Sequence, residues 1–236
     1  MNFLNASWEN LIMANYTIDP SVLIPYLPKG VSLDTFNDQC YVSLVGFMFN
    51  NTRIFKVPVP YLGSFEEINL RFYVKRESEE GIKRGVVFIN ETVPYRPVAW
   101  LANKLYKEHY VSVPTKHDWQ IGLESKKIEY SWKKQNEWEK IAVNASTESF
   151  DLKSGSVEEF IFEHYYGYTK VNELETLEYQ VNHPRWKINK VIDYDIECDF
   201  IKMYGPDFNV LNKRAPDNVL IAEGSQVSVK WKREKI

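Results

Sequence analysis

The sequence has few cysteines and histidines, and neither residue type is spaced as a metal site requires. Its two cysteines, Cys40 and Cys198, lie in separate strand-like stretches of a 236-residue chain, so we expect free thiols rather than a disulfide framework. A Gly-rich phosphate loop, a nucleophile elbow and a Rossmann fingerprint are also missing. We therefore expect neither a metal nor a cofactor. The histidines without ligand spacing are His109, His117, His164 and His183.

The sequence also lacks a long apolar run, a cationic leader and an excess of basic charge. No stretch approaches eighteen apolar residues, so we expect no membrane span. The N-terminal MNFLNASWENLIMANY has no cationic flank before an apolar run, which favours a cytoplasmic protein. The net charge is −3 and the basic residues are dispersed, which argues against nucleic-acid binding. Because no Pro/Gly/Ser linker divides the chain, we expect one domain over residues 1–236.

Aromatic residues are abundant instead, and they favour a β-rich fold. They make up 15% of the chain, with 15 Tyr and 7 Trp, and rings fit pleated, half-buried surfaces well. Two of the strand-like runs flank the turn Lys134-Gln135-Asn136 and predict a hairpin. The runs typical of strands are Gln39–Met48, Phe65–Val74, Gly85–Glu91, Lys126–Lys133, Glu137–Ser146, Val191–Phe200 and Val219–Lys230.

Three short helices are expected between these strands. Asp19 followed by Pro20 is an N-cap with proline at the first helical position, and a second helix opens at Pro97. Ser156 opens a capping box before an apolar stripe, and Gly167 is the expected stop of that third helix. Many strands with few helices indicate an α+β, β-rich fold whose helices pack on or plug a sheet.

The run from Phe65 to Val74 carries the clearest candidate site. Its alternation sends Ile68, Leu70, Phe72 and Val74 to one face. One interpretation is an outer strand with a solvated face, and the other is the wall of a polar pocket. An arginine near a glutamate on one strand face can pair with it or clamp a ligand carboxylate. The side chains on the opposite, polar face are Glu67, Asn69, Arg71 and Tyr73.

Four residues outside this strand complete the candidate site. Glu91 closes an apolar run and either ends an exposed strand or shares the pocket with Glu67, in which case one pKa rises. His109 and Tyr110 follow the Pro97 helix in a loop, where functional residues are over-represented. His164 lies on the apolar stripe of the third helix, as a core histidine with one hydrogen bond would.

The sequence resembles the YqjF-like family of uncharacterised bacterial proteins over nearly its whole length. The resemblance implies a fold like that of acetoacetate decarboxylase. That fold is a curved, mostly antiparallel sheet closing into a cone or barrel, with a ligand cavity inside and a few helices around it. The runs that carry the resemblance are CYVSLVGFMFNNTR from Cys40, FEEINLRFYVKR from Phe65, RGVVFINETVP from Arg84, ANKLYKEHY from Ala102, EEFIFEHYYGYTK from Glu158, HPRWK from His183 and LIAEGS from Leu220.

One departure from the decarboxylase pattern bears on chemistry. That pattern needs a lysine pair in a Gly-Phe-Pro-Lys-Lys stretch, and the comparable place here is Leu105–Val111, with Tyr110 and Val111 where the pair would stand. The nearby Lys104 and Lys107 belong to the solvated face of the Pro97 helix, so we interpret both as surface charges. The resemblance therefore implies the cavity but not lysine-dependent decarboxylation.

Three functions stay open. The first is binding of a small organic, carboxylate-bearing metabolite in a polar and aromatic pocket, with Arg71 as anion clamp. The second is an acid–base enzyme for a carbonyl or enol substrate without a Schiff-base lysine, using Glu67 or Glu91. The third is a structural protein, alone or as a homo-oligomer, whose polar row fills its own interior. The candidate ligand-binding residues are Glu67, Asn69, Arg71, Tyr73, Glu91, His109, Tyr110 and His164, of which Glu67, Glu91, His109 and Tyr110 are also catalytic candidates.

Overall fold

A computed structural model describes residues 2–236, except for the side chains of residues 231–234. The helices are α1 (Pro20–Leu23), η1 (Ile24–Tyr26), α2 (Arg96–Tyr106), α3 (Val157–Phe162), α4 (Phe200–Tyr204) and η2 (Pro206–Lys213). The strands are β1 (Asn2–Ile18), β2 (Ser32–Leu33), β3 (Cys40–Ile54), β4 (Val57–Pro58), β5 (Phe65–Ser78), β6 (Gly81–Val93), β7 (Tyr110–Ser112), β8 (Thr115–Ile121), β9 (Ser125–Lys134), β10 (Glu137–Asp151), β11 (Tyr166–Lys170), β12 (Thr176–Asn182), β13 (Lys187–Glu197) and β14 (Asn218–Lys235).

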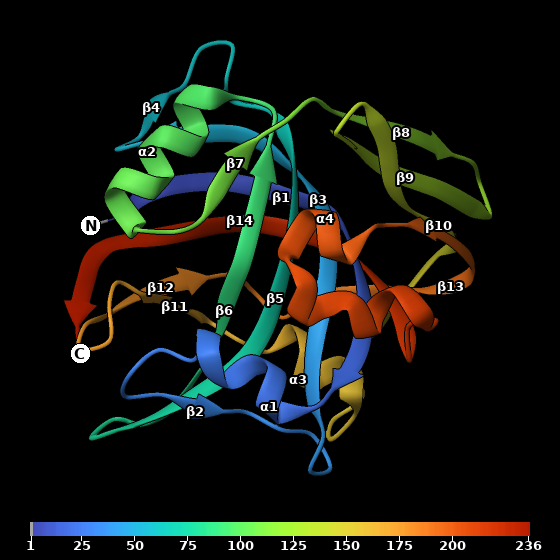
Figure 1. Cartoon of the computed structure of the whole chain (residues 1–236). Helices are drawn as coiled ribbons and strands as arrows, with labels where there is room; N and C mark the ends of the chain where they lie inside the picture. The colour runs from blue at the N-terminus through green and yellow to red at the C-terminus, as the bar shows by residue number, and fades with distance from the viewer. Residues whose placement is uncertain (1) are drawn as a thin grey trace.

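The strands form one curved sheet that closes on itself (Figure 1). Along the ring the order is β1-β3-β5-β6-β11-β12-β14, and β14 pairs back onto β1 over most of its length. The pairing is antiparallel except that β6 lies parallel to β11 and to β7. The predicted β-rich, mostly antiparallel curved sheet is confirmed, as a ring with a side branch rather than a regular barrel.

The side branch makes a second layer outside the ring. It runs β13-β10-β9-β8 from β14, and its inner face packs on the outer face of β1, β3 and β5. Ile128, Tyr130 and Trp132 of β9 alternate toward this interface and are fully buried there. Leu70 and Phe72 of β5 belong to the same core cluster. One face of β5 is therefore used for core packing, which sends its polar face to the inside of the ring.

The inside of the ring holds a second apolar cluster, which α3 covers. Phe160, Ile161 and Phe162 of α3 are buried in this cluster, to which Phe47 and Phe49 of β3 also belong. Helix α2 closes the ring at another point, next to the hairpin that β3 makes with β4 (Figure 1). Among the described residues, no helix is long and apolar enough to cross a membrane.

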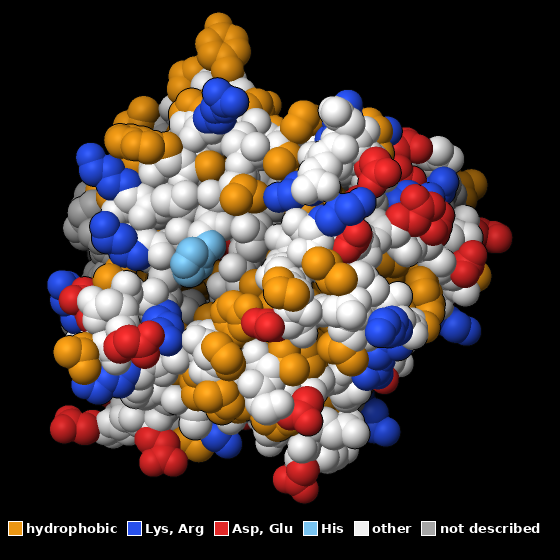
Figure 2. Space-filling view, viewed as in Figure 1, with side chains coloured by type: hydrophobic (Ala, Val, Ile, Leu, Met, Phe, Trp, Pro, Cys, Tyr) orange, Lys and Arg blue, Asp and Glu red, His pale blue; other side chains and the backbone are white. Residues whose placement is uncertain are grey.

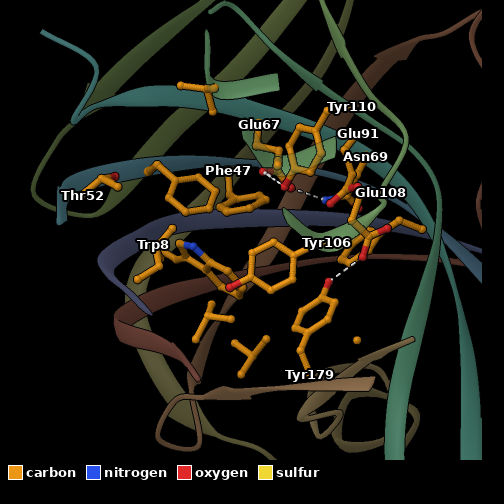
Figure 3. A pocket seen from close by; sticks show the side chains of 18 of the residues that line it. Trp8, Phe47, Thr52, Glu67, Asn69, Glu91, Tyr106, Glu108, Tyr110 and Tyr179 are labelled. Carbon is orange, nitrogen blue, oxygen red and sulfur yellow. Dashed lines mark hydrogen bonds between the residues drawn. The ribbon is translucent and has the colours of Figure 1, made fainter. Parts of the chain in front are cut away.

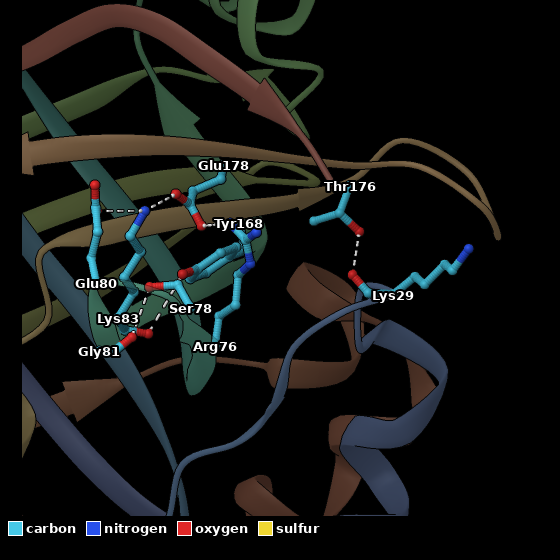
Figure 4. Close-up of polar contacts among 9 residues, drawn as sticks. All are labelled: Lys29, Arg76, Ser78, Glu80, Gly81, Lys83, Tyr168, Thr176 and Glu178. Atoms are coloured by element: carbon cyan, nitrogen blue, oxygen red, sulfur yellow. Dashed lines mark hydrogen bonds and ion pairs between the residues drawn. The ribbon is translucent and has the colours of Figure 1, made fainter.

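An ion-pair cluster reinforces the weakest seam of the ring. Strands β6 and β11 share only two paired positions, so little backbone hydrogen bonding joins them. Glu178 of β12 accepts from Arg76 at 2.7 Å and from Lys83 at 3.1 Å, and both cations come from the β5–β6 hairpin (Figure 4). Because Glu178 is 4% exposed, these contacts lie in a poorly screened environment and tie β12 to the hairpin.

All seven predicted strand runs are present, although their bounds shift. The run predicted to end at Phe200 ends at Glu197, because Asp199 caps the following helix α4 through its side chain. The third predicted helix does begin at the Ser156 cap, but it ends at Phe162 rather than at Gly167. Gly167 lies instead in β11, where a Cβ atom would stand 2.1 Å from the ring of Tyr179. Its role is thus close packing, which a helix-stop interpretation misses.

Candidate functional site

The inner face of β5 borders a cavity of about 240 Å³ inside the ring. Glu67, Asn69 and Arg71 line it at alternate positions of the strand, since side chains two residues apart share a face. Glu91 joins them because its position on β6 pairs with Asn69 across the ladder. Tyr110 of β7 pairs in turn with Glu91 and also lines the cavity. Three adjacent strands thus place these side chains together.

The polar groups gather at one end of the cavity (Figure 3). Glu67 accepts from the Asn69 amide at 3.0 Å and from the Tyr110 hydroxyl at 3.1 Å. Glu108, which follows α2, accepts from the Tyr179 hydroxyl at 2.8 Å and from the hydroxyl of a buried threonine. Figure 3 shows Trp8 away from this group, whereas Phe47, which pairs with Glu67 across β3 and β5, lies between the two. The cavity therefore has an acidic end and an apolar end.

Burial controls the protonation of the acidic end. Burial raises the pKa of Glu67 and of Glu108 to about 7 each, although hydrogen bonds to both carboxylates oppose the rise. Burial, with the charges of Glu108 and Glu67, raises the pKa of Glu91 well above its ordinary value. Burial likewise raises the pKa of Tyr110 and Tyr179 well above theirs, so both hydroxyls keep their protons. Near neutral pH the three carboxyls share protons rather than carrying three full charges.

Arg71 lies in the same row but is held loosely. Its Nη2 donates to the backbone oxygen of Ile161 at 3.4 Å and contacts the sulfur of Met13 at 3.5 Å. Its guanidinium stands 5.6 Å from the centre of the Tyr73 ring. Over the described part of the chain, no carboxylate forms an ion pair with Arg71, and its Nε has no hydrogen-bond partner. Donors of this arginine are therefore available to a ligand.

His164 lines the cavity next to Arg71 as a neutral group. Its Nε2 lies 3.2 Å from Asp34, which also accepts from Arg84 at 2.6 Å. Burial lowers the pKa of His164 to about 4, although the hydrogen bond to Asp34 opposes this. Tyr73 does not reach the cavity; its hydroxyl bonds that of Ser43 at 2.5 Å, and its ring packs on His164. The core-histidine interpretation of His164 thus describes its hydrogen bonding.

His109 is the candidate that the structure does not bring to the cavity. Helix α2 ends when Lys107 adopts a left-handed φ of 58°, and the chain then runs extended. Alternation turns Glu108 and Tyr110 inward and His109 outward, where its side chain is exposed. Only the backbone oxygen of His109 contributes, accepting from the Glu91 N–H at 3.3 Å. The prediction therefore missed Glu108, although the same period-two pattern could have exposed it.

The apolar end is built mainly from rings. Phe49 stacks on Phe65 with centroids 4.8 Å apart, and Trp8 meets Phe47 edge-on at 5.1 Å. Leu101 of α2 adds an aliphatic wall on the other side. Trp8 was not predicted because β1 was not. An apolar group with the size of a ring or short chain suits this end.

The segments that cover the cavity are basic and apolar on their outside. Residues 51–65 and 92–107 contain no Asp or Glu. In Figure 2 the side chains over α2 and the loop above it are hydrophobic or basic, and the acidic ones lie elsewhere on that face. Basic side chains near an opening raise the local concentration of anions. The exposed basic residues of this cover are Arg53, Lys56, Arg96, Lys104 and Lys107.

The lysines near the site are surface charges, as predicted. Lys104 and Lys107 are exposed, and the Nζ of Lys104 sits 4.9 Å from the centre of the Trp100 ring. No lysine is among the described residues that line the cavity, and Tyr110 projects into it instead. Within the same described part, no group of three acidic, histidine or cysteine side chains is placed to hold a metal ion.

Comparison with known proteins agrees with this architecture. The uncharacterized protein YqjF of Bacillus subtilis (strain 168) is 35% identical over 80 residues, which are 34% of this chain and 33% of YqjF, so the match spans about a third of that relative. Three solved structures share the fold at 9–10% identity. The enduracididine biosynthesis enzyme MppR complexed with pyruvate superposes with a TM-score of 0.67 over 99% of this chain and 90% of MppR.

The other two of these three structures have enzyme names of the acetoacetate decarboxylase type. Acetoacetate decarboxylase from Legionella pneumophila has a TM-score of 0.66 over 99% of this chain and 87% of its own. An acetoacetate decarboxylase-like enzyme from Sphingomonas wittichii RW1 has a TM-score of 0.67 over 100% and 94%. At such low identity these matches establish the fold alone. The model of an uncharacterized conserved protein family, DUF2071, matches residues 5–226, so the chain belongs to this family and has the acetoacetate decarboxylase-like fold.

Proposed function

We propose that the protein binds a small organic acid with an apolar body, whose carboxylate pairs with Arg71. The supporting observation is a half-buried arginine that lines the cavity while, among the described side chains, no carboxylate pairs with it. A guanidinium offers a rigid fork of N–H donors that matches a carboxylate. Such a pair is stronger in a poorly hydrated cavity than in water.

The surroundings of Arg71 suit this ligand. His164 is neutral, so it adds no competing charge next to the guanidinium. The rings at the apolar end accept the body of the ligand, and the basic cover draws anions toward the cavity. MppR, which shares the fold, has a solved structure complexed with pyruvate, and small keto acids are therefore the first class of ligand to test here.

Isothermal titration with a set of acids tests the proposal. We would compare pyruvate, hexanoate and 3-phenylpropionate on wild type, Arg71→Ala and Arg71→Lys. We expect Arg71→Ala to weaken binding by at least about tenfold, since a hydrogen bond to a charged group contributes about 1.5–3 kcal/mol. Lys190→Ala is the matched control, because it removes one exposed positive charge far from the polar row. Equal affinity of wild type and Arg71→Ala for every acid that binds would refute the carboxylate clamp.

A second candidate function, acid–base catalysis on a carbonyl or enol substrate, draws on Glu67. A carboxyl whose pKa is about 7 can exchange a proton at physiological pH, and Tyr110 donates to it from β7, which lies on the other side of β6. Such an enzyme would exchange the α-hydrogens of a bound keto acid for deuterium in D₂O, observable by proton NMR. Exchange that survives in Glu67→Gln would contradict this role. Borohydride should trap no adduct on Lys104 or Lys107, since both are exposed.

The third function, a structural protein whose polar row fills its own interior, predicts no cavity at this place. The cavity of about 240 Å³ beside Glu67, Asn69 and Arg71 therefore argues against it.

A further inference from the structure

Two oxygens at the acidic end of the cavity accept no hydrogen bond. Glu91 Oε2 and Asn69 Oδ1 belong to side chains that are 2% and 1% exposed, and neither atom has a partner among the described residues. A buried polar atom without a partner costs about 1–3 kcal/mol, so such atoms are rare unless something else satisfies them. Both atoms belong to residues that line the cavity.

The identity of the Asn69 atom is fixed by its neighbour. Its amide nitrogen donates to the Glu67 carboxylate at 3.0 Å, so its oxygen is the atom left over. Asn69 and Glu91 are paired across β5 and β6, which brings side chains of the same face within about 5 Å of one another. The two unused acceptors are therefore neighbours, and one ligand group with at least two N–H donors can satisfy both.

The charges at this end favour a cation over a neutral donor. Glu67, Glu91 and Glu108 stand together, and burial raises the pKa of each. Few hydroxyl protons offset them, because Tyr110 donates to Glu67 while also lowering the pKa of Glu91, and Tyr179 donates to Glu108. A positive ligand group would replace the protons that the carboxyls otherwise hold.

We propose that Glu91 and Asn69 form a subsite for a protonated amine, so that the ligand carries an amine at one end and a carboxylate at the other. The carboxylate half rests on the function proposed above, and the amine half does not. Asn69 and Arg71 are two residues apart on one strand face, about 7 Å. An α-amino acid, whose charged groups share one carbon, is too short for both subsites. An amino acid with its amine remote from the carboxylate, and an apolar spacer between them, fits the row.

Three probes that differ by one group separate the two halves. 4-(Aminomethyl)benzoate carries both charges, 4-methylbenzoate lacks the amine, and benzylamine lacks the carboxylate. Titration calorimetry at pH 7.5 should show that wild type binds the first probe at least about tenfold more tightly than the second. Glu91→Gln should erase that difference, because it removes the charge and keeps the side-chain shape. The exposed Glu77→Gln on the same strand β5 is the control for lost charge and should preserve it.

The outcomes distinguish failure of the subsite from failure of the carboxylate clamp. If 4-methylbenzoate binds as tightly as 4-(aminomethyl)benzoate, the amine subsite is refuted while the role of Arg71 stands. If benzylamine binds in a Glu91-dependent manner but Arg71→Ala leaves all affinities unchanged, the clamp fails and the subsite stands. No binding of either amine at millimolar concentration refutes the subsite. Asn69→Ala, which should weaken both amines and leave 4-methylbenzoate unchanged, repeats the test if Glu91→Gln fails to fold.

Discussion

Replacing Glu67 by glutamine should make the protein more stable at pH 8 and leave its stability at pH 5 almost unchanged. Glutamine has the shape of a protonated glutamate, and its oxygen can still accept from the Asn69 amide. What the substitution removes is the ability to ionise. Because Glu67 is 3% exposed, ionisation places a charge where water cannot solvate it.

The size of the effect follows from the pKa. Burial raises the pKa of Glu67 from its ordinary 4.5 to about 7. The folded protein therefore holds a proton at pH values where the unfolded chain has released it. The stability that comes from the neutral form is complete below about pH 4.5 and is lost as the pH rises to about 7. At about 1.4 kcal/mol per pH unit, the wild-type protein loses about 3 kcal/mol that the E67Q variant keeps.

Urea denaturation at pH 5, 6, 7 and 8 measures this difference through the extrapolated free energy of unfolding. The control is Glu77→Gln, which neutralises an exposed acid on the same strand and should change stability by less than about 0.5 kcal/mol at every pH. Glu91 and Glu108 remain in the variant, so part of the decline with pH should persist. A constant difference between wild type and Glu67→Gln across the four pH values would refute the reasoning, because a lost hydrogen bond has no such pH dependence.

Two further substitutions test the packing around the cavity. Gly167→Ala should lower the free energy of unfolding by about 2 kcal/mol, since the new Cβ would stand 2.1 Å from the Tyr179 ring. Unchanged stability in urea denaturation would show that β11 and β12 can separate there. Asp34→Asn should cost about 3 kcal/mol by thermal or urea unfolding, because Arg84 and His164 then lose the buried carboxylate that accepts from both. A loss below about 0.5 kcal/mol would mean that this network does not hold α3 on the ring.

The parts of the fold that the sequence predicts are those with unbroken periodicity. Strand β5 alternates from Phe65 onward without interruption along its inner face, so the residue pattern separates its apolar face from its polar face, although the pattern alone leaves the polar face either solvated or in a pocket. Strand β1 could not be assigned in this way, because its register against β3 shifts twice and Asn10 adopts a left-handed φ of 49°. Such irregularities move side chains to the other face, and Trp8 was lost from the predicted site for this reason.

The acidic end illustrates a different limit. Glu108 becomes a site residue because Tyr179 and Thr169, 71 and 61 positions later in the chain, donate to it inside the ring. Alternation with Tyr110 gives the inward direction of Glu108, but no local pattern gives these two partners, since they depend on how β6 and β11 close the sheet. The position of Glu91 in the cavity likewise depends on a tertiary contact, namely its pairing with Asn69 across β5 and β6. Sequence periodicity thus predicted the polar row of β5 and the family resemblance its inward direction, whereas ring closure decides which carboxyls meet there.

The charge balance of the cavity links the proposed ligand to proton release. Where the resemblance to the decarboxylase would place lysines, Tyr110 offers a neutral hydroxyl. Among the described residues that line the cavity, no lysine therefore balances the three carboxyls of the acidic end, and these carboxyls hold protons instead. Because burial raises the pKa of Glu91 well above its ordinary value, a protonated amine bound by Glu91 and Asn69 should expel on the order of one proton in titrations at the same pH as before. Calorimetry of 4-(aminomethyl)benzoate in phosphate and in Tris should then give different apparent heats, because the two buffers absorb a proton with different enthalpies. Identical heats in both buffers would show that the amine meets no protonated carboxyl, and the acidic end would then need another occupant.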